Sequence, residues 1–155
     1  MKIAQIAPLF ESVPPQLYGG TERVVAYLTD ELMRQGHEVT LFASGDSRTT
    51  ARLVPCCERA LRLNHTSYVI PHNVLQLEIL RQCAEAFDIL HFHVDLLHLP
   101  LMRSLGVPHV TTLHGRLDMP DLGPFYTQFA DVPLVSISHD QRRPMPPVRW
   151  MRTIQ

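Results

Sequence analysis

The sequence predicts a single α/β domain built on a doubly wound parallel sheet. Short, nearly continuous apolar runs, typical of strands buried on both faces, alternate with segments of helical periodicity. The predicted order is β-α-β-(β)-α-β-α-β-α-β. Polar residues follow most of the apolar runs, as expected at the carboxyl edge of such a sheet, where ligands bind.

The composition limits the class of protein. The 155 residues suffice for one domain with a hydrophobic core, and 45% hydrophobic with 19% charged residues fits a soluble globular chain. The formal net charge of −1 leaves no basic excess for a nucleic acid. No apolar run approaches the roughly 20 residues of a transmembrane segment. The three cysteines, two of them adjacent, give no disulfide framework and favour a cytoplasmic location.

The first half of the chain begins with a strand over residues 2–7 and a long loop that ends at Gly20. Thr21 is expected to cap the next helix, and Gly36 to end it. One apolar stripe is expected along this helix: Val24, Val25, Leu28 and Leu32. A second strand over 39–43 leads into the polar turn 44–47, and an edge strand at 52–54 is expected to end at Pro55.

The second half repeats the alternation. Helices are expected over 73–86, 96–105 and 121–130, and strands over 87–93, 107–113 and 133–138. The proline-rich stretch 142–147 cannot continue a helix, and 150–155 is too short for an element with packing of its own. The domain is therefore assigned to residues 1–141 and a proline-rich tail to residues 142–155.

The pair Gly19-Gly20, between the first strand and the first helix, has two interpretations. The first N–H groups of a helix lack internal partners and its dipole is positive there, so the pair can cradle a phosphate. Alternatively, the glycines only let the chain turn after Pro14 and Pro15.

Histidines supply the other candidate site residues. His91 and His93 lie two apart on a strand and therefore face the same way, with Asp95 close behind. These three could hold a metal, but histidines on a buried strand more often bond to neighbouring residues, and no metal site is predicted. His114, followed by Gly115, could bind a sugar hydroxyl or carry a proton, or could simply cap a turn.

Charged loop residues are weaker candidates, and three enzyme classes are excluded. Arg116, Arg142 and Arg143 could pair with phosphate, and Asp46 and Asp118 could accept from hydroxyls, although solvated or turn roles are the default for each. Neither G-x-G-x-x-G nor G-x-x-x-x-G-K-[ST] occurs, which counts against a dinucleotide dehydrogenase and a P-loop NTPase. No serine has the G-x-S-x-G context of a hydrolase nucleophile.

Several motifs together resemble the N-terminal half of a GT-B-fold, family-4-type retaining glycosyltransferase. The matching pieces cover nearly the whole chain, and they are MKIAQIAP from Met1, YGGTERVV from Tyr18, GHEVTLFASG from Gly36, FDILHFH from Phe87, TLHG from Thr112 and SIS from Ser136. The glycine pair with Thr21-Glu22 and the later Gly-His-Glu-Val are specific as a set, whereas each piece alone is weak.

The resemblance implies a Rossmann-like domain on the acceptor side of a hexosyltransferase that uses a nucleotide-sugar and needs no metal or cofactor. It implies that Gly19 and Gly20 lie near the donor diphosphate and that His114 is the catalytic residue near the transferred sugar. Asp46, His93 and Arg116 become candidates for binding the acceptor. The acceptor itself is not identified.

One departure from the family pattern affects activity. The family's second, donor-binding domain is absent from this sequence, so we expect the chain alone to be inactive or nearly so, as a fragment, a truncated product or half of a split enzyme. A second domain, or dimerisation through the exposed cleft face, would complete it.

Two other functions stay open. One is a non-catalytic Rossmann-like domain that binds a phosphorylated or sugar ligand or a protein partner. The other is an unrelated doubly wound enzyme that acts on small phosphorylated substrates. Turnover without any nucleotide-sugar would favour the last.

Overall fold

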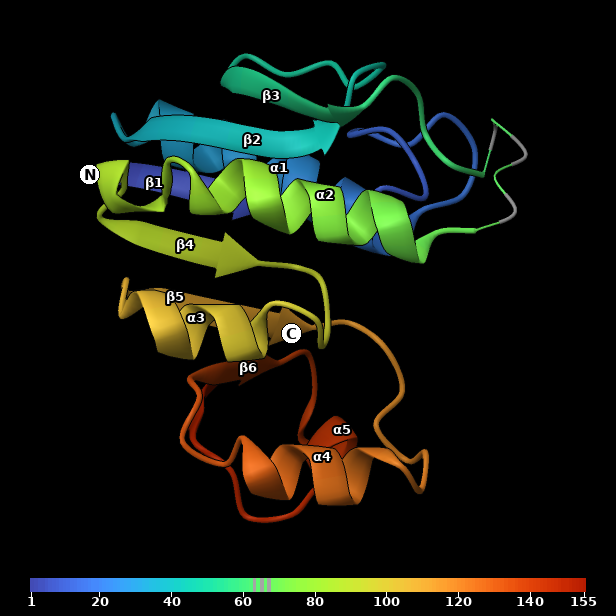
Figure 1. Ribbon diagram of the computed structural model, residues 1–155, viewed down its shortest axis with the longest axis vertical. Helices are drawn as coiled ribbons and strands as arrows, with labels where there is room; N and C mark the ends of the chain where they lie inside the picture. Colours follow the sequence, from blue (N-terminus) through green and yellow to red (C-terminus); the bar gives the residue numbers. More distant parts are fainter. Residues whose placement is uncertain (63, 65, 67) are drawn as a thin grey trace.

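The computed structural model describes residues 1–62, 64, 66 and 68–155. Across these residues, seven strands form one parallel sheet in the order β3-β2-β1-β4-β5-β6-β7 (Figure 1). The strands are β1 (Lys2–Ile6), β2 (Glu38–Ser44), β3 (Arg52–Cys57), β4 (Ile89–Phe92), β5 (His109–Leu113), β6 (Leu134–Ser136) and β7 (Trp150–Thr153).

Helices connect the strands and cover both faces of the sheet. They are α1 (Gly20–Arg34), α2 (Ile70–Arg81), the 3-10 turn η1 (Ala84–Ala86), α3 (Leu99–Leu105), α4 (Leu122–Gln128) and α5 (His139–Arg142). In Figure 1, α2, α3 and α4 lie in front of the sheet and α1 lies behind it. This arrangement confirms the predicted doubly wound, Rossmann-like fold. None of the described helices combines the length and apolar character that crossing a membrane requires.

The hydrophobic core has a cluster on each side of the central strands. Leu77 and Leu80 of α2 pack with Phe42 and Phe92 on one face, and Val25 of α1 packs with Leu41 on the other. Gln76, fully buried beside the first cluster, donates from Nε2 to the carbonyl of Ala7 at 2.8 Å. The core therefore fixes where β1 ends, which is where the loop to the glycine pair begins.

The strand order reverses between β1 and β4. The chain moves outward from β1 to β2 and β3, then returns to the other side of β1 and continues outward through β4, β5, β6 and β7. In open parallel sheets ligands bind outside the carboxyl ends of the strands at such a reversal. The residues that follow β1 and β4 therefore face the position where this fold places a ligand.

Helix α1 differs from its prediction in its start and in its buried face. Thr21 was expected to cap it, but Gly19 is the N-cap and its carbonyl accepts the N–H of Arg23. The buried side chains are Glu22, Val25 and Thr29. Val24 and Leu28 line a cavity beside the N-terminal half of the helix instead of packing in the core. Gly36 follows the helix with φ of 84°, which confirms it as the glycine that ends α1.

Two prolines lie inside elements, and one of them, Pro55, was expected to end its strand. Pro55, predicted to end an edge strand, lies within β3, which continues to Cys57. Because β3 is an edge strand, one side of its backbone is unpaired and a missing N–H is tolerated there. Helix α2 begins at Ile70, earlier than expected, because Pro71 falls in its first turn, where no N–H is needed.

The C-terminal segment is part of the sheet. Residues 150–155 were expected to form no element with its own packing, but Trp150–Thr153 is β7, parallel to β6. Trp150 packs against the cluster around Leu134, and Thr153 Oγ1 lies 2.9 Å from Ser136 Oγ. A strand this short is stable here because it extends a formed sheet, so the small number of residues alone does not exclude a strand.

Candidate functional site

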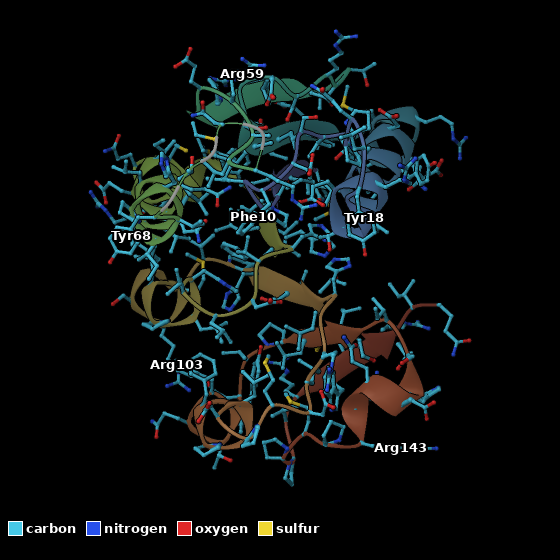
Figure 2. The ribbon with its side chains drawn as sticks, turned by 90° about the vertical axis from the view of Figure 1, so that its right-hand side faces the viewer. Phe10, Tyr18, Arg59, Tyr68, Arg103 and Arg143 are labelled. Carbon is cyan, nitrogen blue, oxygen red and sulfur yellow. The ribbon has the colours of Figure 1, made fainter. Side chains whose placement is uncertain are left out.

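The carboxyl ends of the central strands open onto a cavity of about 790 Å³. Figure 2 faces this edge of the sheet, and it labels Phe10 and Tyr18, both of which line the cavity. The cavity brings together segments far apart in sequence: the loop before α1, the first turns of α1, and the ends of β4 and β5. Of the predicted site residues, it contains Gly19, Gly20, His93 and His114.

The glycine pair forms the start of α1. Gly19 has an extended backbone, with φ of 172°, and no side chain caps the helix. A Cβ on Gly20 would meet no atom within 4 Å, so the backbone at this residue is open to an approaching group. The uncapped N–H groups of a 15-residue helix thus border the cavity, which is the geometry that favours an anion.

A buried carboxylate stands beside the glycine pair. A Cβ on Gly19 would lie 2.8 Å from Oε2 of Glu22, which is itself buried. Burial raises the pKa of Glu22, and backbone hydrogen bonds from Glu22 and Glu11, with a smaller effect of the Arg62 guanidinium, partly oppose that rise. Arg62 also lines the cavity and forms a 3.2 Å ion pair with Glu11, whose side chain is 2% exposed. An anion at the glycines would therefore meet Glu22 on one side and Arg62 nearby.

Hydrogen-bonded side chains from β1, β4, β5 and the residues that follow β4 and β5 form what we call the histidine wall: Gln5, His91, His93, Thr112 and His114. Gln5 and His91 are register partners on neighbouring strands, and Gln5 Nε2 lies 3.4 Å from His91 Nδ1. His93 Nε2 lies 2.7 Å from Gln5 Oε1, and His93 Nδ1 lies 2.9 Å from His114 Nε2. His91 Nε2 lies 2.8 Å from Thr112 Oγ1, which ends this series of hydrogen-bonded side chains.

Burial keeps these imidazoles neutral. Desolvation lowers the pKa of His114 to about 4 and, with a smaller contribution from His114, that of His91 to about 4. The pKa of His93 lies well below its ordinary value for the same reason. A neutral imidazole binds hydroxyl groups without attracting anions. The wall is therefore suited to an uncharged polar ligand, and the glycine end to an anion.

The two remaining site candidates lie apart from this cavity. Arg116 is exposed and pairs with Asp118 at 2.7 Å, in a second hollow of about 660 Å³ that shares His114 with the first. Asp46 lies in a different hollow, beside Pro14 and Ser47, that shares no residue with the main cavity. Asp46 Oδ1 accepts the N–H of Ala60 at 3.1 Å, so this carboxylate holds a loop.

His91, His93 and Asp95 do not form a metal site in the part of the chain that the structure describes. No group of three or more histidine, cysteine, aspartate or glutamate side chains there is arranged to hold a metal ion. The His91 and His93 rings instead pack with centroids 4.2 Å apart and bond to Gln5, Thr112 and His114. The two strand histidines therefore form hydrogen bonds to neighbouring side chains, which is the alternative to a metal site that the sequence left open.

Sequence reasoning missed two residues that line the cavity, Glu22 in its buried position and Arg62, and it missed Gln5, which is buried behind the cavity histidines. Gln5 carried a usable signal, because it is a polar residue in the middle of the apolar run of β1. A buried amide must find partners, and strand periodicity makes His91 and His93 share a face. Arg62 gave no such signal, since it lies in a segment without periodicity.

Comparisons with known proteins identify the family of the chain. The family model for Glycosyltransferase Family 4 matches residues 18–153. A search of curated proteins finds no significant match. The chain is similar in structure to AviGT4, a glycosyltransferase involved in avilamycin A biosynthesis, with a TM-score of 0.58 and 24% identity. The match covers 91% of this chain and 37% of AviGT4, so the chain spans little more than a third of that protein's length.

The family match extends from the glycine pair to β7 and so includes every residue of the histidine wall except Gln5. The AviGT4 match supports the fold alone, at this level of identity. With more than half of its residues matched by the family model, the chain belongs to glycosyltransferase family 4, and its parallel sheet is that of an N-terminal GT-B-type domain.

Proposed function

We propose that this domain forms one wall of the active site of a retaining hexosyltransferase that takes its sugar from a nucleotide-sugar. The observation that carries the proposal is the meeting of the open N-terminus of α1 and His114 in one cavity. A nucleotide-sugar has a diphosphate next to a hydroxylated ring, which is the same pairing of an anion with a neutral polar group.

The roles of the residues follow from their surroundings. Gly19 and Gly20 receive the diphosphate, with the N–H groups of α1 supplying the donors. His114 contacts a hydroxyl of the transferred sugar as a neutral hydrogen-bonding group, because an imidazole with a pKa of about 4 is uncharged at neutral pH and cannot act as an imidazolium acid. Arg116, exposed in the adjoining hollow, is the acceptor-side residue that we retain. Asp46 and His93, both engaged with protein groups, rank below it.

A second wall is needed to enclose the ligand. Phe10, Tyr18, Val24, Ile137 and Ile154 line the cavity as exposed apolar side chains. Exposed apolar surface of this kind is usually covered by another protein surface. We propose that a second, donor-binding domain covers it, and that transfer requires both. We also propose a cytoplasmic location, where the three free cysteines stay reduced.

The same apolar rim supports a second candidate function, a non-catalytic domain whose partner is a protein or a phosphorylated ligand. Titration calorimetry with UDP-glucose and GDP-mannose separates the two. Binding that appears only when a donor-binding family-4 domain is added supports the transferase. Tight binding of a phosphorylated ligand by this chain alone, without transfer in the combined assay, supports the second candidate.

A variant makes the transferase test specific. Gly20→Trp places a large side chain where a Cβ now meets nothing within 4 Å, so the fold is expected to tolerate it. In the two-domain enzyme it should block the diphosphate position and abolish transfer. Thermal unfolding of the variant chain is the control, and unchanged transfer by a folded Gly20→Trp enzyme would contradict the assignment.

A further inference from the structure

The hydrogen bonds of the histidine wall all point the same way along the chain of side chains. Gln5 Oε1 can only accept, so His93 Nε2, 2.7 Å away, carries a proton and donates it. A neutral His93 then has an unprotonated Nδ1, which accepts from His114 Nε2 at 2.9 Å. Beyond Gln5 the donation continues in the same direction: Gln5 Nε2 donates to His91 Nδ1, and His91 Nε2 donates to Thr112 Oγ1.

This direction determines which nitrogen of His114 faces the ligand and in which form. Because Nε2 of His114 carries the proton that is given to His93, Nδ1 of a neutral ring carries none. Nδ1 has no hydrogen-bond partner among the described residues and is not one of their buried unpartnered atoms. Since His114 borders the cavity, Nδ1 is the nitrogen that a ligand can reach.

We propose that Gln5 and His93 are positioning residues that hold His114 in the one neutral tautomer whose Nδ1 accepts a hydrogen bond from the ligand. The inference rests on the proposed function for the identity of that ligand. A lone pair at this place attracts a hydroxyl and repels a phosphate oxygen. The ring hydroxyls of the sugar therefore belong on the His114 side, and the diphosphate on the side of Gly19 and Gly20.

Gln5 determines the direction of the whole chain. If its amide were turned over, Nε2 would donate to His93, each histidine would exchange its protonated nitrogen, and Nδ1 of His114 would become a donor. Gln5 and His93 are almost completely buried between β1 and β4, so water does not compete for these bonds. The lowered pKa values of the three histidines agree with the neutral forms that the chain requires.

Long-range ¹H–¹⁵N correlation spectra of the whole chain at pH 7 test the proposal, because they report which ring nitrogen of each histidine is protonated. We expect Nε2 of His114, His93 and His91 to be protonated and Nδ1 of each to be unprotonated. A protonated Nδ1 on His114, or a charged ring, would overturn the proposal. This measurement needs no variant and no ligand.

Two variants then separate positioning from general structure. Gln5→Met removes the acceptor of His93, and the Nδ1-protonated form of His114 should rise about fivefold, the ratio that one net hydrogen bond of ordinary strength sustains. Thr112→Val, at the other end of the hydrogen-bonded series, should leave the tautomer of His114 unchanged. If Gln5→Met does not fold, His93→Leu gives the same readout. A folded variant in which His114 keeps its tautomer would refute the role of Gln5 and His93.

The transfer assay keeps this inference separate from the proposed function. Absence of transfer in the two-domain enzyme, with Nδ1 of His114 unprotonated, would refute the transferase and leave the tautomer assignment in place. Active transfer together with a protonated Nδ1 on His114 would refute the tautomer assignment and leave the transferase in place.

Discussion

Gly19 lies directly against Glu22: a Cβ at Gly19 would come within 2.8 Å of Glu22 Oε2 and within 2.8 Å of Pro15 Cβ. The proline is rigid, and the carboxylate is buried, so neither group moves away easily. At Gly20, the next residue, a Cβ meets nothing within 4 Å. The two glycines therefore serve different purposes, although the sequence presents them as a pair.

Alanine substitutions at the two positions should have opposite effects on stability. Gly19→Ala overpacks the contact with Pro15 and Glu22 and should lower the free energy of unfolding by about 1–3 kcal/mol. Gly20→Ala replaces a glycine at the first helical residue and should raise it by about 0.4–1 kcal/mol. Urea denaturation of both variants measures the difference. Equal effects would show that the contact at Gly19 does not constrain the fold.

The buried histidines should make the domain less stable in weak acid. An unfolded imidazole has a pKa of about 6.5, whereas the folded pKa is about 4 for His91 and His114 and about 3 for His98. Between these values the unfolded chain binds more protons, so the free energy of unfolding rises with pH. Each fully buried histidine contributes up to about 1.4 kcal/mol per pH unit. Glu22 and Asp95, whose carboxyl pKa values burial raises, oppose this slope with two groups.

Denaturant titrations between pH 5 and 6.5 measure this slope. His91→Gln should reduce it by one histidine's share, at most about 1.4 kcal/mol per pH unit near pH 5 and about half of that at pH 6.5. The control is His139→Gln, an exposed histidine in the short helix α5. A wild-type stability that does not change over this range would contradict the burial of the histidine wall.

Periodicity and glycine positions were enough to predict the fold class, the order of the elements down to β6 and the edge of the sheet at which the main cavity lies. Helix starts were predicted less well, because the structure uses Gly19 as a cap without a side chain and allows Pro71 in a first turn. Those choices depend on neighbouring packing, which local propensity does not contain. β7 was missed because a strand of four residues owes its stability to the sheet that it joins.

The site was predicted in part for a similar reason. The rule that ligands gather at the carboxyl edge correctly grouped Gly19, Gly20, His93 and His114 in one cavity. The same rule grouped Asp46 with them, but β2 is displaced from the reversal point, and the loop that follows it forms its own hollow. Whether these residues bind and react as assigned remains a prediction.

The ion pair between Arg62 and Glu11 should be worth more than the ion pairs on the surface. Glu11 is 2% exposed and its Oε2 has no hydrogen-bond partner among the described residues, so Arg62→Met would leave a buried carboxylate uncompensated. Arg62 itself is half exposed, so we expect a loss of about 2–3 kcal/mol, below the range for fully buried pairs. Arg116→Met, which breaks the exposed pair with Asp118, should cost about 1 kcal/mol or less.

Equal losses in urea denaturation for Arg62→Met and Arg116→Met would contradict the special position of Glu11. The double variant Glu11→Gln with Arg62→Met sharpens the test. Removing both charges should recover part of the stability lost in Arg62→Met, because the unpaired buried carboxylate, and not the lost contact, is the main cost.

The last prediction concerns β7. Ending the chain after Arg149 removes the parallel strand beside β6, the packing of Trp150 and the contact between Thr153 and Ser136. Trp150 also carries the Arg142 guanidinium 4.8 Å above its ring. The shortened chain should lose at least about 2 kcal/mol, since a half-buried tryptophan contributes somewhat less than the 3–5 kcal/mol of a buried one. Trp150→Ala alone should reproduce most of that loss, whereas Met151→Ala, an exposed residue of the same strand, should not. If both the shortened chain and Trp150→Ala unfold at the wild-type urea midpoint, the segment behaves as the unpacked tail that its length suggested, and its place in the sheet is wrong.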